Sequence, residues 1–466
     1  MNSHVFREYD IRGVAARDLT SDLAYRIGQG LGTLLRPEGP EQGRFTVAVA
    51  RDCRESGPRL LGELTRGLVD AGADVIDCGV GPTPLLYFAA HHLGTGGAVM
   101  VTGSHNPGDE NGFKILRGKG SFFGEDLQAL RRWVEGGAAP PDRGRGSVRE
   151  EAVEDAYVAR LTAGLSLGAA PPRVVIDAGN GAAGPLALRA LRALGVEPVA
   201  LYCDMDGTFP NHHPDPTVPA NLETLIATVR RERAAVGLAF DGDGDRLGVV
   251  DATGEILWGD RLLALFARDV LRASPGAMVL GEVKCSETLF ADVARHGGRP
   301  LMWKTGHSLI KTKMRETGAL LAGEMSGHFF FADRYPGYDD GIYAGLRLLE
   351  ILAREGRTAG ALLEDLPHPV STPELRVRCP DSDKQRVVAR VRERLHGRGE
   401  LVDIDGVRVK YADGAWALVR ASNTGPILVL RFEAPSEARL REVRTEVFAA
   451  LVEAGLDVGP SAAAHG

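Results

Sequence analysis

One pattern, repeated three times along the chain, restricts the possible folds more than any other feature. A short apolar run typical of a strand is followed by leucines at helical spacing and then by a second apolar run. The three units begin at residues 46–52, 173–181 and 277–286. Because near-continuous apolar strands that alternate with amphipathic helices are typical of sheets covered on both faces, the pattern predicts three α/β domains.

The character of the sequence changes after about Pro369. Several short runs that read as strands, with a charged, helix-like stretch after the first, precede a final helix at Ser436–Glu453. This order predicts a smaller α+β domain with an antiparallel sheet. Four domains suit a chain of 466 residues, since a single core stops growing at roughly 250–300 residues. The predicted domains are 1–149, 150–254, 255–368 and 369–466.

Composition excludes several classes of protein. The chain has 44% hydrophobic and 25% charged residues and a net charge of −7, which argues against nucleic acid as a partner. No apolar run approaches the roughly 20 residues that span a bilayer, and no apolar leader begins the chain, so we expect no membrane partner and a cytoplasmic location. Five cysteines without a CxxC pattern predict neither a disulfide framework nor a zinc site.

Three aspartates, Asp241, Asp243 and Asp245, are separated by single glycines. On a regular strand such residues share one face but stay too far apart to meet at one small ion. Gly242 and Gly244 permit positive φ angles that would curl the backbone and turn the carboxylates toward a common centre. Three carboxylates this close repel one another unless a hard divalent cation offsets their charge. The loop therefore predicts a metal site, with a solvated acidic turn as the alternative.

The spacing excludes an EF-hand calcium loop. Its sixth position is Arg246 instead of glycine, and its twelfth is Ala252 instead of glutamate. Arg246 also indicates that an anion is handled beside the metal. A metal with few protein ligands, an arginine and a serine on a turn together indicate phosphoryl transfer, in which carboxylates and a phosphate oxygen share Mg²⁺.

The serine is Ser104, in the turn-rich segment VTGSHNPGDENGFKI at residues 101–115. It lacks the second glycine of a G-x-S-x-G nucleophile elbow, and we expect the side chains of Ser104 and His105 to point apart, as adjacent side chains usually do. A hydrolase nucleophile is therefore not predicted. A serine that carries a covalent phosphate fits better, with a capping serine in an Asn-Pro turn as the alternative.

Five motifs give the chain a resemblance to a known family. They are FREYDIRG at 6–13, TGSHNP at 102–107, DGDGDR at 241–246, GEMSGH at 323–328 and RASNTG at 420–425. In this order they resemble the α-D-phosphohexomutase superfamily, and the first resembles its phosphomannomutase/phosphoglucomutase branch. The resemblance covers essentially the whole chain and implies four domains around a central cleft, the fourth with a TATA-binding-protein-like fold.

The resemblance also implies an activity. A phosphate on Ser104 would be transferred to a hexose phosphate, giving a bisphosphorylated sugar that turns around and returns the other phosphate. The net reaction is a reversible exchange between positions 6 and 1 of mannose and glucose phosphates. Glucose 1,6-bisphosphate would act as the activator.

Roles for individual residues follow from the same resemblance. Mg²⁺ would be held by an oxygen on Ser104 and by the three aspartates of DGDGDR. Arg246 and Lys284 would add positive charge, His105 and Asn106 would support the serine loop, and Lys114 and His328 are the candidates for proton transfer. The residues implied to bind substrate are Tyr9, Arg12, Lys284, Lys304, His307, Glu324, Ser326, His328, Arg420, Ser422, Asn423 and Thr424.

Three alternatives stay open at this point. A phosphatase or kinase-like enzyme would carry an aspartyl nucleophile motif or an ATP loop, and neither is present. A catalytically dead sugar-phosphate-binding protein would have lost Ser104 or a metal-loop aspartate, and none is lost. A phosphoglucosamine mutase of the same superfamily typically opens with a GTDGIRG-like segment and has Gln where this chain has Met325.

Overall fold

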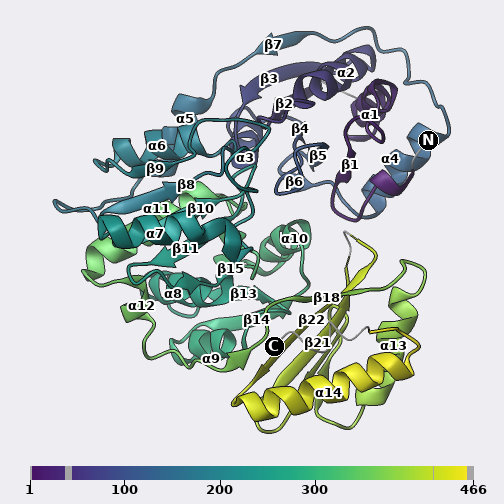
Figure 1. Ribbon diagram of the computed structural model, residues 1–466. Helices are drawn as coiled ribbons and strands as arrows, with labels where there is room; N and C mark the ends of the chain where they lie inside the picture. The colour runs from purple at the N-terminus through teal and green to yellow at the C-terminus, as the bar shows by residue number, and fades with distance from the viewer. Residues whose placement is uncertain (1–2, 37–44, 423–424, 459–466) are drawn as a thin grey trace.

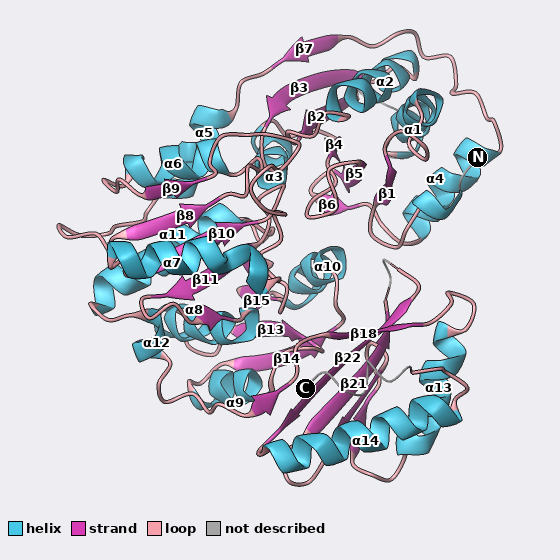
Figure 2. Ribbon diagram, in the orientation of Figure 1, coloured by secondary structure: helices cyan, strands magenta, loops and turns pink. Residues whose placement is uncertain are grey.

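The computed structural model describes residues 3–36, 45–422 and 425–458. Four sheets follow one another along the chain, each with its own helices (Figures 1 and 2). We number the domains by these sheets; the predicted boundaries stay predictions, and the first falls inside β7 (Val148–Glu150), which pairs with β3 in the first sheet. Among the described residues, no helix combines the length and apolar character needed to cross a membrane.

The first sheet is mixed. In sheet order its strands are β1 (Ile11–Val14), β5 (Glu110–Arg117), β4 (Gly97–Val101), β2 (Thr46–Arg51), β3 (Asp74–Val80) and β7, with β6 (Gly120–Ser121) beside β5. Strands β4, β2, β3 and β7 run parallel, and β5 lies antiparallel to both β4 and β1. The helices are η1 (Ser3–Val5), α1 (Ser21–Leu34), α2 (Gly57–Asp70), α3 (Thr83–His92) and α4 (Glu125–Glu135).

The second and third sheets repeat this plan. The second has the order β12 (Ile256–Leu257), β11 (Leu247–Asp251), β10 (Val236–Phe240), β8 (Val174–Asp177) and β9 (Val199–Leu201). The third has the order β14 (Arg299–Trp303), β13 (Met278–Glu282), β15 (Leu321–Gly323) and β16 (Phe329–Phe331). Their helices are α5 (Glu154–Thr162), α6 (Gly184–Ala193), η2 (Pro219–Leu222), α7 (Glu223–Glu232), α8 (Gly259–Ala273), α9 (Glu287–Arg295), α10 (His307–Thr317), α11 (Gly341–Glu355) and α12 (Ala359–Leu362).

The three predicted units are confirmed as strand, helix and parallel strand. They are β2-α2-β3, β8-α6-β9 and β13-α9-β14. The repeat did not predict the antiparallel strand that follows the parallel ones in each sheet, namely β5, β11 and β16. These added strands form one side of each loop described below.

The fourth sheet is antiparallel throughout its described pairs. Its order is β17 (Val370–Ser371), β22 (Ile427–Ala434), β21 (Trp416–Ala421), β20 (Val407–Lys410) and β19 (Glu400–Val402), with β18 (Leu375–Arg378) also on β22. The helices are α13 (Lys384–Leu395) and α14 (Glu437–Glu453), and the side chain of Ser436 caps α14. An antiparallel sheet with these helices confirms the predicted α+β domain. Along β21, Ala417 and Val419 pack toward the helices, and Trp416 and Leu418 pack with Val283 of the third domain.

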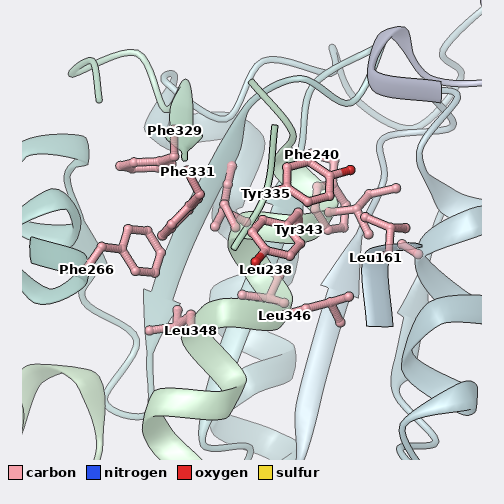
Figure 3. Packing of buried hydrophobic residues seen from close by; sticks show 14 of the residues in the cluster. Leu161, Leu238, Phe240, Phe266, Phe329, Phe331, Tyr335, Tyr343, Leu346 and Leu348 are labelled. Carbon is pink, nitrogen blue, oxygen red and sulfur yellow. The ribbon is translucent and has the colours of Figure 1, made fainter. Parts of the chain in front are cut away.

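The largest hydrophobic core is continuous through the first three domains. Helix α11 lies within it, and its side chains Tyr343, Leu346 and Leu348 are 1% exposed or less. Figure 3 shows these residues among Phe266, Phe331 and their neighbours, with the Phe266 and Phe331 rings edge to face at 5.0 Å. A shared core of this kind holds the first three domains in one arrangement, and the site residues depend on that arrangement.

Candidate active site

Each of four sequence motifs lies on the connection between two antiparallel strands. The serine loop joins β4 to β5, the DGDGDR loop joins β10 to β11, the GEMSGH segment joins β15 to β16, and the RASNTG segment joins β21 to β22. In the first three domains the incoming strand is part of the parallel sheet. Such strand ends are where open α/β sheets place their ligand sites.

The serine and the carboxylates meet directly. Ser104 is 1% exposed, and its hydroxyl donates a hydrogen bond to Oδ2 of Asp241 at 3.0 Å. Gly242 allows this approach, because a Cβ there would lie 2.3 Å from the carbonyl oxygen of Ser104. The expected positive φ is found at Gly244, at 73°, and not at Gly242. Gly242 is needed for close packing rather than for a left-handed turn.

The expectation that Ser104 and His105 point apart is wrong. Oγ of Ser104 lies 3.1 Å from Nδ1 of His105, because Ser104 adopts a left-handed backbone with a φ of 50° that turns both side chains to one side. Burial, followed by the positive charge of Arg246 and Arg12, lowers the pKa of His105 well below its usual range. The imidazole is therefore neutral near pH 7 beside the serine hydroxyl.

Arg54 holds the serine loop and was not predicted from the sequence. Its side chain is fully buried, at 0% exposed. The guanidinium donates to the carbonyl oxygens of Ser104 at 2.7 Å, Asn106 at 2.6 Å, Glu110 at 2.8 Å and also Pro107. One side chain thus satisfies four backbone acceptors in a loop that has few bonds of its own.

Asp52 fixes Arg54 in turn. Its carboxylate accepts from Nε of Arg54 at 3.2 Å and from the hydroxyl of Thr102 at 2.7 Å, and Thr102 accepts from the backbone of Ser104. Asp52 directly follows strand β2. A search of the sequence for polar residues at the carboxyl ends of apolar strands would have found it.

The three metal-loop aspartates are completely buried and close together. All three are 0% exposed, and one oxygen from each lies within 4.8 Å of the others. Among the described residues, Oδ1 of Asp243 and Oδ1 of Asp245 are buried without a hydrogen-bond partner. Burial and the two neighbouring carboxylates raise the pKa of Asp241 well above its usual range. Orphaned, crowded carboxylate oxygens fit a divalent cation.

Lys114 supplies part of the missing positive charge. Its ammonium donates to Oδ2 of Asp243 at 2.7 Å and to Oδ2 of Asp245 at 2.5 Å. Burial lowers the pKa of Lys114, but these carboxylates outweigh it and raise the pKa above the ordinary value. Lys114 therefore keeps its proton, and one ammonium among three carboxylates leaves room for further positive charge.

Arg246 joins the metal loop to the third domain. Its Nε donates to Nε2 of His328 at 3.0 Å, and its backbone N–H donates to Oδ1 of Asp241 at 3.2 Å. The backbones of Arg246 and His328 also form an isolated antiparallel bridge. The ring of His307 stacks on His328 with centroids 5.5 Å apart. These contacts bring predicted residues from three loops to one place.

A second group gathers where the third and fourth domains face each other, near α10 and the end of β21 in Figure 1. Arg420 donates to Asp405 at 2.9 Å, and the same carboxylate accepts from the backbone of Thr305 at 3.1 Å. Glu324 accepts from the backbone of Gly306 at 2.7 Å, and Lys284 donates to Glu374 at 3.0 Å.

The remaining predicted residues lie between or beside these groups. The hydroxyl of Tyr9 donates to the carbonyl of Thr305 at 2.9 Å, and Arg12 donates to the side chain of Asn106 at 2.9 Å. Ser326 is half-buried, Ser422 is buried, and Lys304 is exposed just after β14. Asn423 and Thr424 lie outside the described residues.

These features define a multidomain α/β protein in which a serine hydroxyl lies against a buried carboxylate cluster suited to a cation. Family models for the four domains of phosphoglucomutase/phosphomannomutase match residues 3–136 (alpha/beta/alpha domain I), 155–254 (domain II), 258–370 (domain III) and 374–450 (C-terminal domain). The chain belongs to the phosphoglucomutase/phosphomannomutase family.

Individual relatives agree with this assignment. The chain is 50% identical to a phosphomannomutase/phosphoglucomutase of Pseudomonas aeruginosa over 95% of this chain and 94% of the relative. It is 46% identical to a phosphoglucomutase of Neisseria meningitidis, with 96% of each chain covered. A crystal structure of a family protein from Burkholderia thailandensis has a TM-score of 0.90 at 47% identity and covers 98% of this chain and 99% of its own.

Replacing Arg54 tests the support of the serine loop. Arg54→Met keeps the unbranched stem of the side chain but removes the guanidinium, which leaves buried carbonyl oxygens unpaired, at about 1–3 kcal/mol each before the loop relaxes. We expect a lower thermal midpoint and faster hydrogen exchange at residues 104–110. The matched control is Arg66→Met, since Arg66 is half-exposed, at 52%, and its ion pair is with a neighbouring surface glutamate. Equal exchange in both variants would contradict the assigned role of Arg54.

Proposed function

We propose that this chain is a phosphohexomutase. It transfers a phosphoryl group reversibly between positions 6 and 1 of mannose and glucose phosphates, through a phosphate on Ser104 and a bisphosphorylated sugar. One observation carries the assignment of the residues: the Ser104 hydroxyl lies 3.0 Å from Asp241, in a carboxylate cluster with unpartnered oxygens. Family membership supports the overall reaction.

The metal is proposed to be Mg²⁺, held by Asp241, Asp243, Asp245 and an oxygen on the phosphorylated Ser104. When bound, the cation supplies positive charge that stabilises the phosphoryl group during transfer. Arg246 is next to the same cluster and adds a fixed positive charge. Lys114, predicted as a candidate for proton transfer, is better suited to hold charge because its pKa is raised.

His328 is the proposed proton acceptor for the attacking sugar hydroxyl. It is buried, at 4% exposed, and its Nε2 faces Arg246 beside the metal loop. The hydroxyl proton would pass to this nitrogen as the sugar oxygen attacks phosphorus. The same imidazolium would return a proton when the second transfer releases the product. His105 is proposed to hold the Ser104 side chain through the contact between its Nδ1 and the serine Oγ, at 3.1 Å.

Binding of the sugar is proposed for the second group. Glu324 and Ser326 provide acceptors and a hydroxyl for sugar hydroxyl groups, and Lys284 is near them. Arg420, Ser422, Asn423 and Thr424 would hold the phosphate that is not transferred, since an arginine with backbone donors suits an oxyanion. The proposed sugar-binding site is also lined by Tyr9, Arg12, Lys304 and His307.

An activator is proposed for the same chemical reason. An enzyme that loses the Ser104 phosphate can be recharged only by a bisphosphorylated sugar, for which glucose 1,6-bisphosphate is the candidate. Location in the cytoplasm stays a prediction from the sequence.

The first experiment removes the covalent carrier. Ser104→Ala should nearly abolish turnover and leave the fold intact, because the lost hydroxyl carries the transferred phosphate. Intact-mass spectrometry and peptide mapping should find one phosphate on Ser104 in the wild-type enzyme and none at position 104 in the variant. A phosphate mapped to another residue, or wild-type turnover in the variant, would disprove this mechanism.

The second experiment removes the metal. After treatment with EDTA and gel filtration, activity should be lost, because the phosphoryl group then faces three carboxylates whose charge Lys114 and Arg246 balance only in part. Addition of Mg²⁺ should restore activity, and elemental analysis should show one bound metal per chain. Full activity in a preparation shown to be free of metal would rule out the proposed site.

The third experiment compares substrates. Mannose and glucose differ only at C2, so a site that binds other hydroxyls and the phosphate discriminates weakly, on the order of tenfold, whereas direct recognition of C2 would give about 10⁴. We expect similar kcat/KM values for mannose 1-phosphate and glucose 1-phosphate, and poor activity with glucosamine 1-phosphate. A strong preference for the amino sugar would overturn the substrate assignment and leave the phosphoserine mechanism intact.

A further inference from the structure

The two ring nitrogens of His328 face different partners. Nε of Arg246 always carries a proton, so the 3.0 Å contact makes Nε2 of His328 the acceptor. A neutral imidazole that accepts at Nε2 must carry its proton on Nδ1. That nitrogen lies 3.0 Å from Oδ2 of Asp339. The contacts thus define one tautomer, with Nδ1 protonated and the Nε2 lone pair directed toward the metal loop.

Asp339 is firmly held in this position. Its carboxylate is 0% exposed, and Oδ1 accepts from Nζ of Lys311 at 2.8 Å. Its backbone forms an isolated bridge with Phe330, two residues after His328. In the described parts of the chain, Nδ1 of His328 and Oδ2 of Asp339 are both buried without a hydrogen-bond partner. The ion-pair contact between them, at 3.0 Å, is therefore the closest polar contact that either atom makes.

Asp340, the next residue along the chain, fixes the backbone position of Asp339. Asp340 caps α11 by accepting from the backbone of Tyr343 at 2.9 Å. Its second oxygen accepts from the hydroxyls of Tyr157 and Tyr335, each at 2.8 Å. Since Tyr157 belongs to the second domain and Tyr335 to the third, the position of Asp339 is fixed by the packing between domains.

Other groups near the pair are farther away. Nδ1 of His307 is 3.5 Å from Oδ2 of Asp339, and Oδ1 of Asp245 is 3.6 Å from Nδ1 of His328. Lys311 balances the charge of Asp339, and its ammonium also lies over the ring of Tyr87 at 4.2 Å. The shortest contact of the His328 Nδ1 with an acid is therefore the one to Asp339.

We propose that Asp339 is a positioning residue for phosphoryl transfer, which holds His328 in the Nδ1-protonated tautomer so that Nε2 can accept the proton of the attacking sugar hydroxyl. This inference rests on the proposed function. In the step, Nε2 gives up its hydrogen bond from Arg246, the sugar O–H bond breaks and an Nε2–H bond forms. The sugar oxygen bonds to phosphorus as the bond from phosphorus to the Ser104 oxygen breaks. The carboxylate of Asp339 stabilises the imidazolium and keeps its own charge.

The test is Asp339→Asn, which keeps the shape but offers an N–H that can bind Nδ1 and favour the opposite tautomer. We expect kcat to fall by about 10²–10⁴, the range that general acid–base catalysis supplies. KM, the phosphate on Ser104 and the metal content should stay unchanged. In the His328→Ala background, Asp339→Asn should lower kcat little further, since the group that it positions is already absent.

A spectroscopic measurement reads the tautomer itself. Long-range ¹H–¹⁵N spectra of histidine-labelled enzyme should place the His328 proton on Nδ1 in the wild-type protein and not in Asp339→Asn, with His328→Ala used to assign the signals. If Asp339→Asn unfolds because Lys311 is left unpaired, the same measurements are made on Lys311→Met/Asp339→Asn against Lys311→Met.

The outcomes that would contradict the role of Asp339 can be told apart from those that would contradict the proposed function. Wild-type kcat in Asp339→Asn, or an equal fall in both His328 backgrounds, would overturn the positioning role. Loss of bound metal in Asp339→Asn would overturn it as well, because Asp339 would then be a ligand. If the wild-type enzyme does not interconvert hexose phosphates, the proposed function fails instead, and the tautomer spectrum still decides whether Asp339 holds His328.

Discussion

The repulsion among three buried carboxylates is the constraint on which the rest of the site depends. Asp241, Asp243 and Asp245 belong to the second domain, but the ammonium that partly neutralises them belongs to Lys114 of the first. The hydroxyl of Thr83, also in the first domain, donates to Asp243. Burying such charges without these partners would cost several kcal/mol, so the acidic loop requires the first two domains to stay packed together.

The same dependence extends to the other domains through single residues. Arg246 reaches from the metal loop to His328, and Tyr9 reaches from the first domain to the backbone of Thr305. Asp405 then connects Thr305 with Arg420 of the fourth domain. Polar contacts therefore link the DGDGDR loop to the GEMSGH segment, and the first domain to Arg420 of the RASNTG segment. Packing of the first three domains keeps most of these contacts in place, whereas the fourth domain has a separate core.

Much of the fold was predictable from local pattern. Apolar strands and leucines at helical spacing gave the three repeated units, and the aspartates at alternate positions gave the carboxylate cluster. Arg54 and Asp339 carry no such pattern, since each is one charged residue whose importance comes from partners reached through the tertiary fold. Asp339 follows His328 by eleven positions and reaches it only because its backbone pairs with Phe330.

The contact between Ser104 and His105 could not be predicted for a different reason. Its geometry depends on a left-handed backbone at a residue other than glycine, which is costly locally. Here the backbone of Ser104 is held by accepting a hydrogen bond from Arg54 and donating one to the hydroxyl of Thr102. Sequence motifs identified which residues belong together. They did not specify the backbone angles that direct the side chains.

Each of the four loops connects two antiparallel strands, so the position of the loop ends does not depend on the residues at the loop tip. Neighbouring antiparallel strands are about 5 Å apart, so the two ends of every loop are fixed by sheet hydrogen bonds that do not involve its tip. The register of β15 and β16 is set by the pairs Leu321–Phe331, Ala322–Phe330 and Gly323–Phe329, of which only Gly323 belongs to the GEMSGH segment. Residues 324–327 of this segment can therefore be exchanged to alter contacts to a sugar, provided that His328, the proposed proton acceptor at its end, is kept.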